Sequence, residues 1–336
     1  MGRREPNFSQ ILKVVRREKP DRPTLFEFFM NMPLYERVTG RKRGEGALEE
    51  LKITAEAFCA LGYDYVFCKA SDMQFDTQAH KKEKTISLND GCAITDWTSF
   101  ERFRWPDPDA FDFSRLEKIR QYLPDGMKLM VAGPGGVLEN AIALTGYDNL
   151  CMMLYEEPEL VKAIFDGIGS RLVRYYEIAM QFDAVGLLMS NDDWGFNSQT
   201  LLSPTHMRQY VFPWHRRIVE TAHIAGRPAL LHSCGYMNEI MEDVIEDMRY
   251  DAKHSFEDKI LPIEECYKRW GGRIALLGGI DLDFLIRSPI PVIQERCRNL
   301  LALTGKTGGF ALGSGNSIPE YVPFENFIAM IECATI

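Results

Sequence analysis

The sequence predicts an α/β protein built as a single (β/α)8 barrel. Short apolar runs rich in β-branched and aromatic residues recur along the chain, and most are followed by a stretch with helical character. The runs are continuously apolar, which is typical of parallel strands buried on both faces. The 336 residues exceed the size of an ordinary single core but suit a barrel of eight strand–helix units.

Eight segments have this strand character. In chain order they are residues 24–29, 63–69, 128–133, 184–190, 228–232, 250–255, 273–278 and 309–313. After a helical lead-in over about residues 1–22, helices are expected at residues 46–61, 114–122, 147–182 with a break near Pro158, 203–225 with a break at Pro213, 236–248, 262–270 and 291–303. A doubly wound sheet is the alternative arrangement of the same elements.

Two local signals refine this prediction. Ser203 precedes Pro204, which combines a preferred N-cap residue with proline at the first helical position. Residues 85–99 are expected to form a β-hairpin insertion, because the Asn-Asp-Gly sequence at 89–91 is typical of a tight turn between strands. Placed between the second and third strands, the hairpin is expected near the barrel mouth, shaping the pocket or a partner interface.

Composition excludes several classes of protein. The chain has 39 Lys and Arg against 48 Asp and Glu, a formal net charge of −9, and no basic patch that would bind nucleic acid. No window is long and apolar enough to span a membrane, and the N-terminus lacks the apolar stretch of a secretory signal, so we expect a cytoplasmic protein. No linker-like segment divides residues 1–336, which favours one domain.

Polar residues follow the predicted strands at the end where barrel enzymes place their active sites. His232 and Cys234 stand out, because an imidazole and a thiolate two residues apart at a strand end can meet at one zinc ion. A catalytic zinc needs a third protein ligand. A buried histidine beside a core cysteine is the structural alternative. The other polar residues at these strand ends are Glu27, Lys69, Asp72, Glu139, Asn191, Asp192, Asp193, His254, Glu257, Asp281, Asp283 and Asn316, among which a structural role is expected for His254 and Glu257.

Three stretches carry a resemblance to a known family: LLHSCGYMNEIMEDVIEDMRYDAKHS, IALLGGIDLDFL and GGFALGSGNSIPEYVPFENFIAMIE. They resemble the C-terminal half of the uroporphyrinogen decarboxylase superfamily, which includes the zinc methyltransferases of corrinoid-dependent methyl transfer. The similarity covers roughly residues 20–332 and independently implies the (β/α)8 barrel. True decarboxylases carry an arginine-rich N-terminal signature for the tetrapyrrole carboxylates. The matching LFEFFMNMPL at 25–34 has no arginine, which counts against a tetrapyrrole substrate. The His-Ser-Cys-Gly motif at 232–235 instead resembles the methyltransferase branch.

The resemblance also implies a site. In the methyltransferase branch His, Cys and a later Cys bind zinc, and the first two map onto His232 and Cys234. Asn316 stands where the later cysteine is expected. Either Glu139 or Asp193 completes the ligand set, or metal binding is weakened or lost. Asp193, Glu139 and Asp281 are the catalytic candidates, and Asn316, Asp192 and Glu27 the substrate-binding ones. For Asp192, Asp193 and Asp281 the structural alternative is helix capping.

The leading hypothesis is therefore a zinc-dependent methyltransferase. It would move a methyl group between a small methylated substrate, as an O-demethylase does, or an acceptor thiol, and a corrinoid protein. The cobalamin would belong to that partner, because the chain has no cobalamin-binding signature of the Asp-x-His-x-x-Gly type. A decarboxylase of a carboxylated small molecule or tetrapyrrole is the alternative, and a non-catalytic scaffolding barrel the third. A homodimer is left open.

Overall fold

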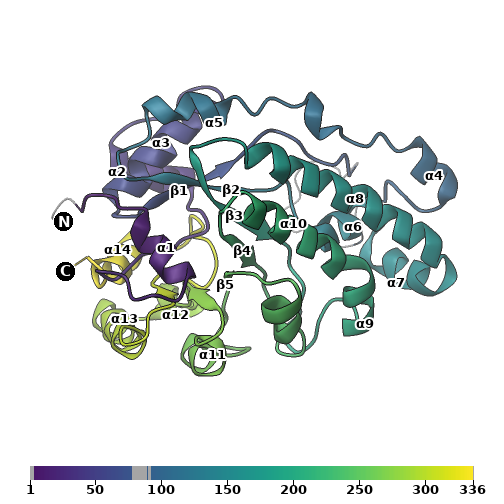
Figure 1. The fold of residues 1–336 in the computed structure, drawn as a ribbon. Coiled ribbons are helices and arrows are strands. Elements are labelled where there is room, and N and C mark those ends of the chain that lie inside the picture. Colours follow the sequence, from purple (N-terminus) through teal and green to yellow (C-terminus); the bar gives the residue numbers. More distant parts are fainter. Residues whose placement is uncertain (1–3, 78–88, 90–91, 336) are drawn as a thin grey trace.

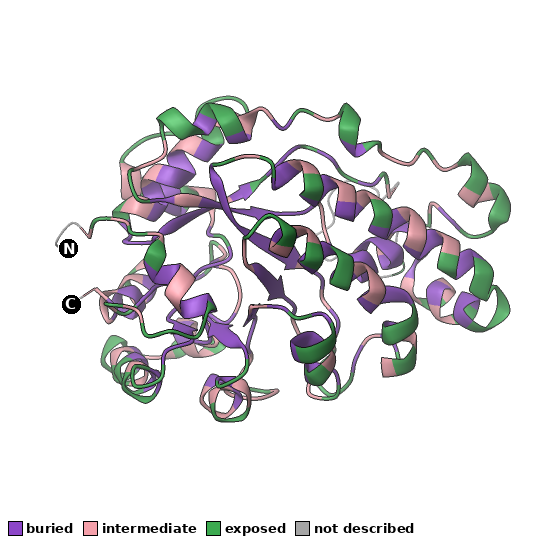
Figure 2. Cartoon of the chain, viewed as in Figure 1, coloured by how far each residue is buried: buried purple, intermediate pink, exposed green. Residues whose placement is uncertain are grey.

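Seven parallel strands form one curled sheet in the computed structural model, which describes residues 4–77, 89 and 92–335. The strands pair in chain order, and the helices surround the sheet (Figure 1). Their bounds are β1 (Tyr65–Lys69), β2 (Lys128–Ala132), β3 (Val185–Asn191), β4 (Ala229–His232), β5 (Ala252–His254), β6 (Ala275–Leu277) and β7 (Phe310–Ala311). The strands are almost entirely buried, whereas the helices expose their outer faces (Figure 2). The α/β class is therefore confirmed.

Strand register brings the polar residues at the ends of β3, β4 and β5 to one level. Asn191, the last residue of β3, lies opposite His232, the last residue of β4. His232 in turn lies opposite His254, the last residue of β5. The carboxyl ends of three consecutive strands therefore meet at this edge of the sheet.

Residues 24–29 do not form the first strand that the sequence predicts. They contribute one isolated parallel bridge, between Leu25 and Leu312, beside β7. On the other side the backbone N–H of Glu27 donates to the Tyr65 hydroxyl at 2.8 Å. Because a side chain occupies this backbone donor, no ladder to β1 forms along the segment, and the prediction of a regular strand is wrong here. The segment still lies between the two outer strands of the sheet, with Phe26 stacked on Tyr65.

The helices follow most of the predicted boundaries. The expected break at Pro158 is confirmed, since α7 ends and α8 begins there, and the Ser203 side chain caps α9 by accepting the His206 N–H at 3.2 Å. The α-helices are α1 (Ser9–Val15), α2 (Met32–Thr39), α3 (Ala47–Ala60), α4 (Trp97–Arg102), α5 (Arg115–Lys118), α6 (Val137–Thr145), α7 (Tyr147–Glu156), α8 (Pro158–Ala179), α9 (Pro204–His206), α10 (Phe212–Ile224), α11 (Ile263–Trp270), α12 (Leu282–Arg287), α13 (Ile290–Thr304) and α14 (Phe324–Glu332).

Three expected helices take a different form. Residues 114–122 form only the short α5, followed by a 3-10 turn, Ile119–Gln121. Residues 203–225 are interrupted by a π-helical turn, Met207–Val211, directly before α10, so the break lies ahead of Pro213 and the proline sits in the first turn of α10. Residues 236–248 retain only a short π-helical turn, Asp243–Asp247. Proline is tolerated in a first helical turn because its missing N–H would have no partner there.

The hairpin expected at residues 85–99 is not found in the part of the chain that is described. Residues 85–88, 90 and 91 lie outside that part. Residues 92–96 form no strand, and α4 begins at Trp97. The reason is a capping box: the Asp96 carboxylate accepts the Ser99 backbone N–H at 2.7 Å, and the Ser99 hydroxyl accepts the Asp96 N–H at 3.0 Å. No helix among the described residues is long and apolar enough to cross a membrane.

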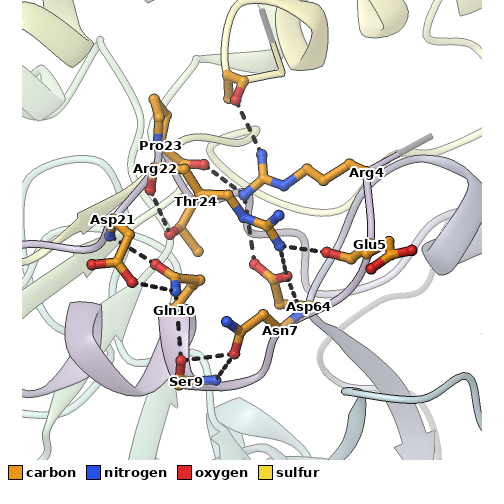
Figure 3. Close-up of polar contacts among 11 residues, drawn as sticks. Arg4, Glu5, Asn7, Ser9, Gln10, Asp21, Arg22, Pro23, Thr24 and Asp64 are labelled. Carbon is orange, nitrogen blue, oxygen red and sulfur yellow. Dashed lines mark hydrogen bonds and ion pairs between the residues drawn. The ribbon is translucent and has the colours of Figure 1, made fainter. Parts of the chain in front are cut away.

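A buried ion network closes the opposite end of the sheet, just before β1 (Figure 3). Asp64 is 1% exposed and accepts a hydrogen bond from Arg22 at 2.6 Å and from the Asn7 backbone N–H at 2.8 Å. Arg4 lies 3.6 Å from the second carboxylate oxygen and donates to the Ala334 carbonyl at 3.0 Å. Asp64 therefore joins the two ends of the described chain to the first strand.

We expect Asp64→Asn to lower the free energy of unfolding by about 2 kcal/mol, because two arginines lose their buried counter-charge while the Asn7 bond survives. Urea unfolding followed by circular dichroism measures this change. Asp21→Asn is the matched control: Asp21 pairs with Lys13 at 2.7 Å, but its side chain is 67% exposed. Solvent screens that pair, so the control should keep the wild-type midpoint. Equal midpoints for all three proteins would contradict the prediction.

Candidate metal centre

The turn after β4 places Cys234 beside the turn after β3. The Gly195 N–H donates to the Cys234 carbonyl at 3.2 Å, and the Tyr236 N–H donates to the Phe196 carbonyl at 2.6 Å. Gly235 makes this close approach feasible, since it has a φ of +85° and a Cβ there would lie 2.0 Å from the Gly195 oxygen. The two turns are thus held against each other at the carboxyl edge of the sheet.

Asp193, His232 and Cys234 form a cluster of metal-binding side chains, called here the Asp-His-Cys cluster. One ligand atom from each lies within 4.8 Å of the others, and no other group of three or more such residues meets this criterion among the described residues. The Cys234 Sγ lies 3.6 Å from the His232 Nε2. A tetrahedral zinc with ordinary bond lengths separates a sulfur and a nitrogen ligand by about 3.5 Å, so the pair fits zinc.

Glu139 and Asp193 are the two carboxylates expected beside His232 and Cys234. The cluster contains Asp193. One of its oxygens accepts the Cys234 backbone N–H at 2.8 Å, which holds the carboxylate against the thiol. Without a cation nearby the thiol stays protonated, because burial and the Asp193 charge raise the pKa of Cys234 well above its usual value. Burial also lowers the pKa of His232 well below 6.5, so this imidazole is neutral. A metal ion would reverse the thiol's preference and bind it as thiolate.

Asn316 lies at the cluster as a donor. Its amide nitrogen is 3.3 Å from the Cys234 Sγ, while its oxygen accepts the Ser317 N–H at 2.8 Å. The Ser255 hydroxyl lies 3.6 Å from the same sulfur. Both groups can donate hydrogen bonds to a thiolate, which lowers its free energy. The residue that replaces the expected cysteine thus supports the sulfur ligand of Cys234.

Glu139 lies beside the cluster but outside it. Its carboxylate accepts the Gly136 N–H at 2.8 Å and an Asn191 amide N–H at 3.2 Å, and the Asp193 backbone N–H also bonds to it. Burial, reinforced by the charges of Asp192 and Asp193, raises the pKa of Glu139 to about 8. The side chain is therefore largely protonated at neutral pH. Glu139 belongs to no group of metal-binding side chains among the described residues, which does not favour its predicted role as a zinc ligand.

Asp192 points away from the cluster and caps α6. Its carboxylate accepts the Leu138 and Glu139 backbone N–H groups, both at 2.9 Å, and is 2.9 Å from the His215 Nε2. Gly136 allows this approach, because a Cβ there would lie 2.1 Å from the carboxylate. The capping alternative holds for Asp192, although the capped helix is α6 and not the one after Ser203. Both oxygens bond to protein groups and the side chain is fully buried, so it presents no surface to a substrate.

Asp281 is also engaged by the backbone. It is the N-cap of α12, accepting the Phe284 N–H at 3.1 Å, and its other oxygen accepts the Asp258 N–H at 2.9 Å. This arrangement favours the capping alternative over the predicted catalytic role.

Glu27 is fully buried, with no access to solvent. Its carboxylate accepts the Ser314 N–H at 2.7 Å and the Ser314 hydroxyl at 2.6 Å. Burial raises its pKa to about 8 despite these hydrogen bonds. Glu27 thus supports the turn that leads to Asn316, and the predicted substrate contact stays a prediction.

We expect this buried acid to make stability fall as pH rises. Glu27 binds its proton more tightly in the folded state, with a pKa of about 8 against 4.5, so between these values folding is favoured by the proton and weakened by its loss. Glu27→Gln should reduce the steepness of that fall by about 1.4 kcal/mol per pH unit between pH 5 and 7.5. Urea unfolding at four pH values measures the slope. An unchanged slope would mean that Glu27 is ionised throughout.

The sequence assigned no chemical role to His254, His215 or Ser255, yet the structure places the first and last at the cluster and His215 behind it. The signal that was available is the strand register, because His254 ends the strand next to His232. Reading it required the exact last residue of each strand, which apolar runs do not define.

Comparison with known proteins agrees with this arrangement. The uroporphyrinogen decarboxylase (URO-D) family profile matches residues 93–335. A uroporphyrinogen decarboxylase of Anaeromyxobacter dehalogenans is 27% identical over 221 residues, which cover 65% of this chain and 61% of that protein. A methylated-thiol–coenzyme M methyltransferase of Methanosarcina mazei is 22% identical over 285 residues, which cover 81% of this chain and 74% of that protein.

A solved structure gives the same picture of the fold. A methyltransferase from Methanosarcina mazei superposes with a TM-score of 0.71 at 17% identity, covering 98% of this chain and 99% of the other. The family profile spans well over half of the sequence and includes the turns that carry Asp193, Cys234 and Asn316. The chain belongs to the uroporphyrinogen decarboxylase family, and it is an enzyme-family member that resembles methyltransferases as well as decarboxylases.

Proposed function

We propose that this chain is a zinc-dependent methyltransferase that moves a methyl group between a small methylated substrate, or an acceptor thiol, and a corrinoid protein. The Asp-His-Cys cluster is the observation that carries the proposal. A carboxylate, an imidazole and a thiol suit zinc, and three protein ligands leave a fourth position for the reacting atom. The similarity to a methylated-thiol–coenzyme M methyltransferase supports the same activity.

Zinc bound here would act as a Lewis acid toward the oxygen, nitrogen or sulfur atom that carries the methyl group. The chain's own residues supply the rest. Asn316 and Ser255 hold the Cys234 sulfur, and Asp193 fixes the Cys234 backbone. A departing heteroatom also needs a proton. Glu139 is largely protonated near neutral pH, and it is bonded to the backbone of a cluster residue, so we assign it that proton.

Decarboxylation is the second candidate, supported by the decarboxylase relatives. The charges near the cluster argue against a polycarboxylate substrate. Asp193 is an acid at the cluster, and the Glu257 carboxylate accepts the Gly235 N–H at 3.3 Å. The ammonium of Lys253 is buried and bonds to the backbone carbonyls of Ser233 and Ser255. A substrate bearing several carboxylates would meet like charges at this edge of the sheet.

The two candidates are separated by one assay with two readouts. The purified chain is mixed with methylated donors and a reduced corrinoid protein, and the cobalt absorbance is followed together with carbon dioxide release. Methyl transfer that requires both the corrinoid protein and one zinc per chain would support the proposal. Carbon dioxide release from a carboxylated substrate without corrinoid would overturn it in favour of the decarboxylase. Metal that stays far below one per chain would remove the zinc assignment.

A further inference from the structure

Two buried imidazoles face each other behind the Asp-His-Cys cluster. The Nδ1 atoms of His232 and His254 are 2.8 Å apart, a hydrogen-bond distance. His254 has no exposed surface and His232 is 6% exposed. Aromatic rings hold both side chains in place: Phe28 stacks on His232 at 4.4 Å, and Phe26 meets His254 edge-on at 5.1 Å. The pair is therefore fixed, and no water-filled space separates the two nitrogens.

The other nitrogen of His254 reports where its proton lies. The His254 Nε2 is 3.2 Å from the backbone carbonyl oxygen of Ser314. A carbonyl oxygen can only accept a hydrogen bond, so Nε2 carries the proton. The ring nitrogens of His254 contact the Ser314 carbonyl and the His232 Nδ1, and no carboxylate among the described residues pairs with them, so the ring carries a single proton. The His254 Nδ1 is then a bare acceptor.

The proton between the two rings must consequently belong to His232. Its Nδ1–H donates to the His254 Nδ1, which leaves the His232 Nε2 with a free lone pair. That nitrogen faces the Cys234 sulfur at 3.6 Å. Resting on the metal site of the proposed function, we infer that His254 is a positioning residue that holds His232 in the Nδ1–H tautomer and so presents the Nε2 lone pair to the metal.

The surroundings of His254 maintain the direction of the hydrogen bond from the His232 Nδ1–H to the His254 Nδ1. The Ser314 carbonyl is fixed because Glu27 accepts both the N–H and the hydroxyl of the same residue. Gly278, with a φ of +78°, leaves room for the ring, since a Cβ there would lie 2.8 Å from the His254 Cδ2. Histidine ligands commonly donate their second N–H to a carbonyl or carboxylate. Here the acceptor is a second imidazole, that of His254. The Ser314 carbonyl determines which of its nitrogens carries the proton.

The inference is tested first without metal. The chain contains six histidines, so ¹⁵N-labelled histidine gives a small set of ring signals, and His232→Gln identifies those of residue 232. In the metal-free wild type we expect residue 232 to show a protonated Nδ1 and a bare Nε2. His254→Leu removes the acceptor and should release residue 232 to the Nε2–H tautomer. His254→Asn keeps an acceptor oxygen close to the former Nδ1 position and should retain the wild-type signals.

Zinc affinity, measured by competition with a chromophoric chelator, provides the second readout. We expect His254→Leu to weaken zinc binding by about 10- to 100-fold and His254→Asn to restore most of it. His206→Leu is the control for histidine loss, because His206 lies in α9, away from the cluster. Thermal melts of the metal-free variants verify folding.

The outcomes separate the inference from the proposed function. A wild type in which residue 232 carries its proton on Nε2 would overturn the inference whether or not His254→Leu folds. Wild-type zinc affinity in a folded His254→Leu would overturn it as well, while leaving the metal site intact. Failure of the wild type itself to bind zinc would instead refute the proposed function, and the tautomer measurement in the metal-free chain would still decide how the imidazole pair is polarised.

Discussion

We expect Cys234→Ala to abolish the stoichiometric zinc binding of the proposed function and, with it, methyl transfer to a corrinoid protein, while the fold persists. The substitution removes one of the three candidate ligands in the cluster. Loss of a residue that merely supports a ligand costs about 10- to 100-fold in metal affinity, so loss of a ligand should cost more than about 100-fold. The fold should survive because Cys234 lies in the turn after β4, outside the packed interior of the sheet.

The measurement is metal content by elemental analysis after dialysis, combined with circular dichroism. Cys92→Ala is the matched control, since Cys92 is an exposed thiol that belongs to no metal-binding group among the described residues. His232→Ala should match Cys234→Ala in metal content. One zinc per chain in a folded Cys234→Ala variant would place the metal elsewhere and remove the cluster from the mechanism. Loss of the circular dichroism signal would return Cys234 to the role of a core cysteine.

Much of the fold follows from apolar runs, and the failures have local causes. Seven of the eight expected strands form because their runs are buried on both faces in a parallel sheet. The eighth, at residues 24–29, has the same composition, but the Tyr65 hydroxyl takes the Glu27 N–H that a ladder would need. A distant side chain cannot be read from a local run. The hairpin is not confirmed: its turn lies outside the described residues, and at the end of the expected second strand Asp96 and Ser99 form the capping box that begins α4.

Part of the candidate site could likewise be predicted from the sequence, and part could not. His232 and Cys234 are two residues apart, so one strand end brings them together, and the sequence suffices to pair them. Asp192 and Asp193 are adjacent, and successive side chains of an extended segment point to opposite sides. One of them must face the cluster and the other the helix layer. Which one does so depends on the residue at which β3 ends, a boundary that hydrophobic pattern does not fix.

Asp192 points away from the cluster, toward α6 and His215. Its replacement is therefore the substitution for which we expect the largest loss of stability. Asp192 and its partner His215 are both fully buried. The carboxylate satisfies two backbone N–H groups at the start of α6 and the His215 Nε2, whose other nitrogen is 2.7 Å from the Tyr250 hydroxyl. Asp192→Ala leaves three buried donors without a partner, each at about 1–3 kcal/mol. We therefore expect the free energy of unfolding to fall by about 3–5 kcal/mol.

Asp281→Ala is the control for this change, because Asp281 also caps a helix but is only partly buried and faces no histidine. Asp281→Ala removes the N-cap of α12 and the bond to the Asp258 N–H, both at a partly exposed site, at a cost of about 1–2 kcal/mol. The two variants should therefore differ clearly in urea midpoint at pH 7. The folded fraction of Asp192→Ala should still bind zinc, since Asp193 and not Asp192 faces the metal ligands. An Asp192→Ala variant that keeps wild-type stability but no longer binds zinc would contradict this assignment. It would mean that the turn after β3 rearranges and that Asp192, not Asp193, is the carboxylate of the metal site.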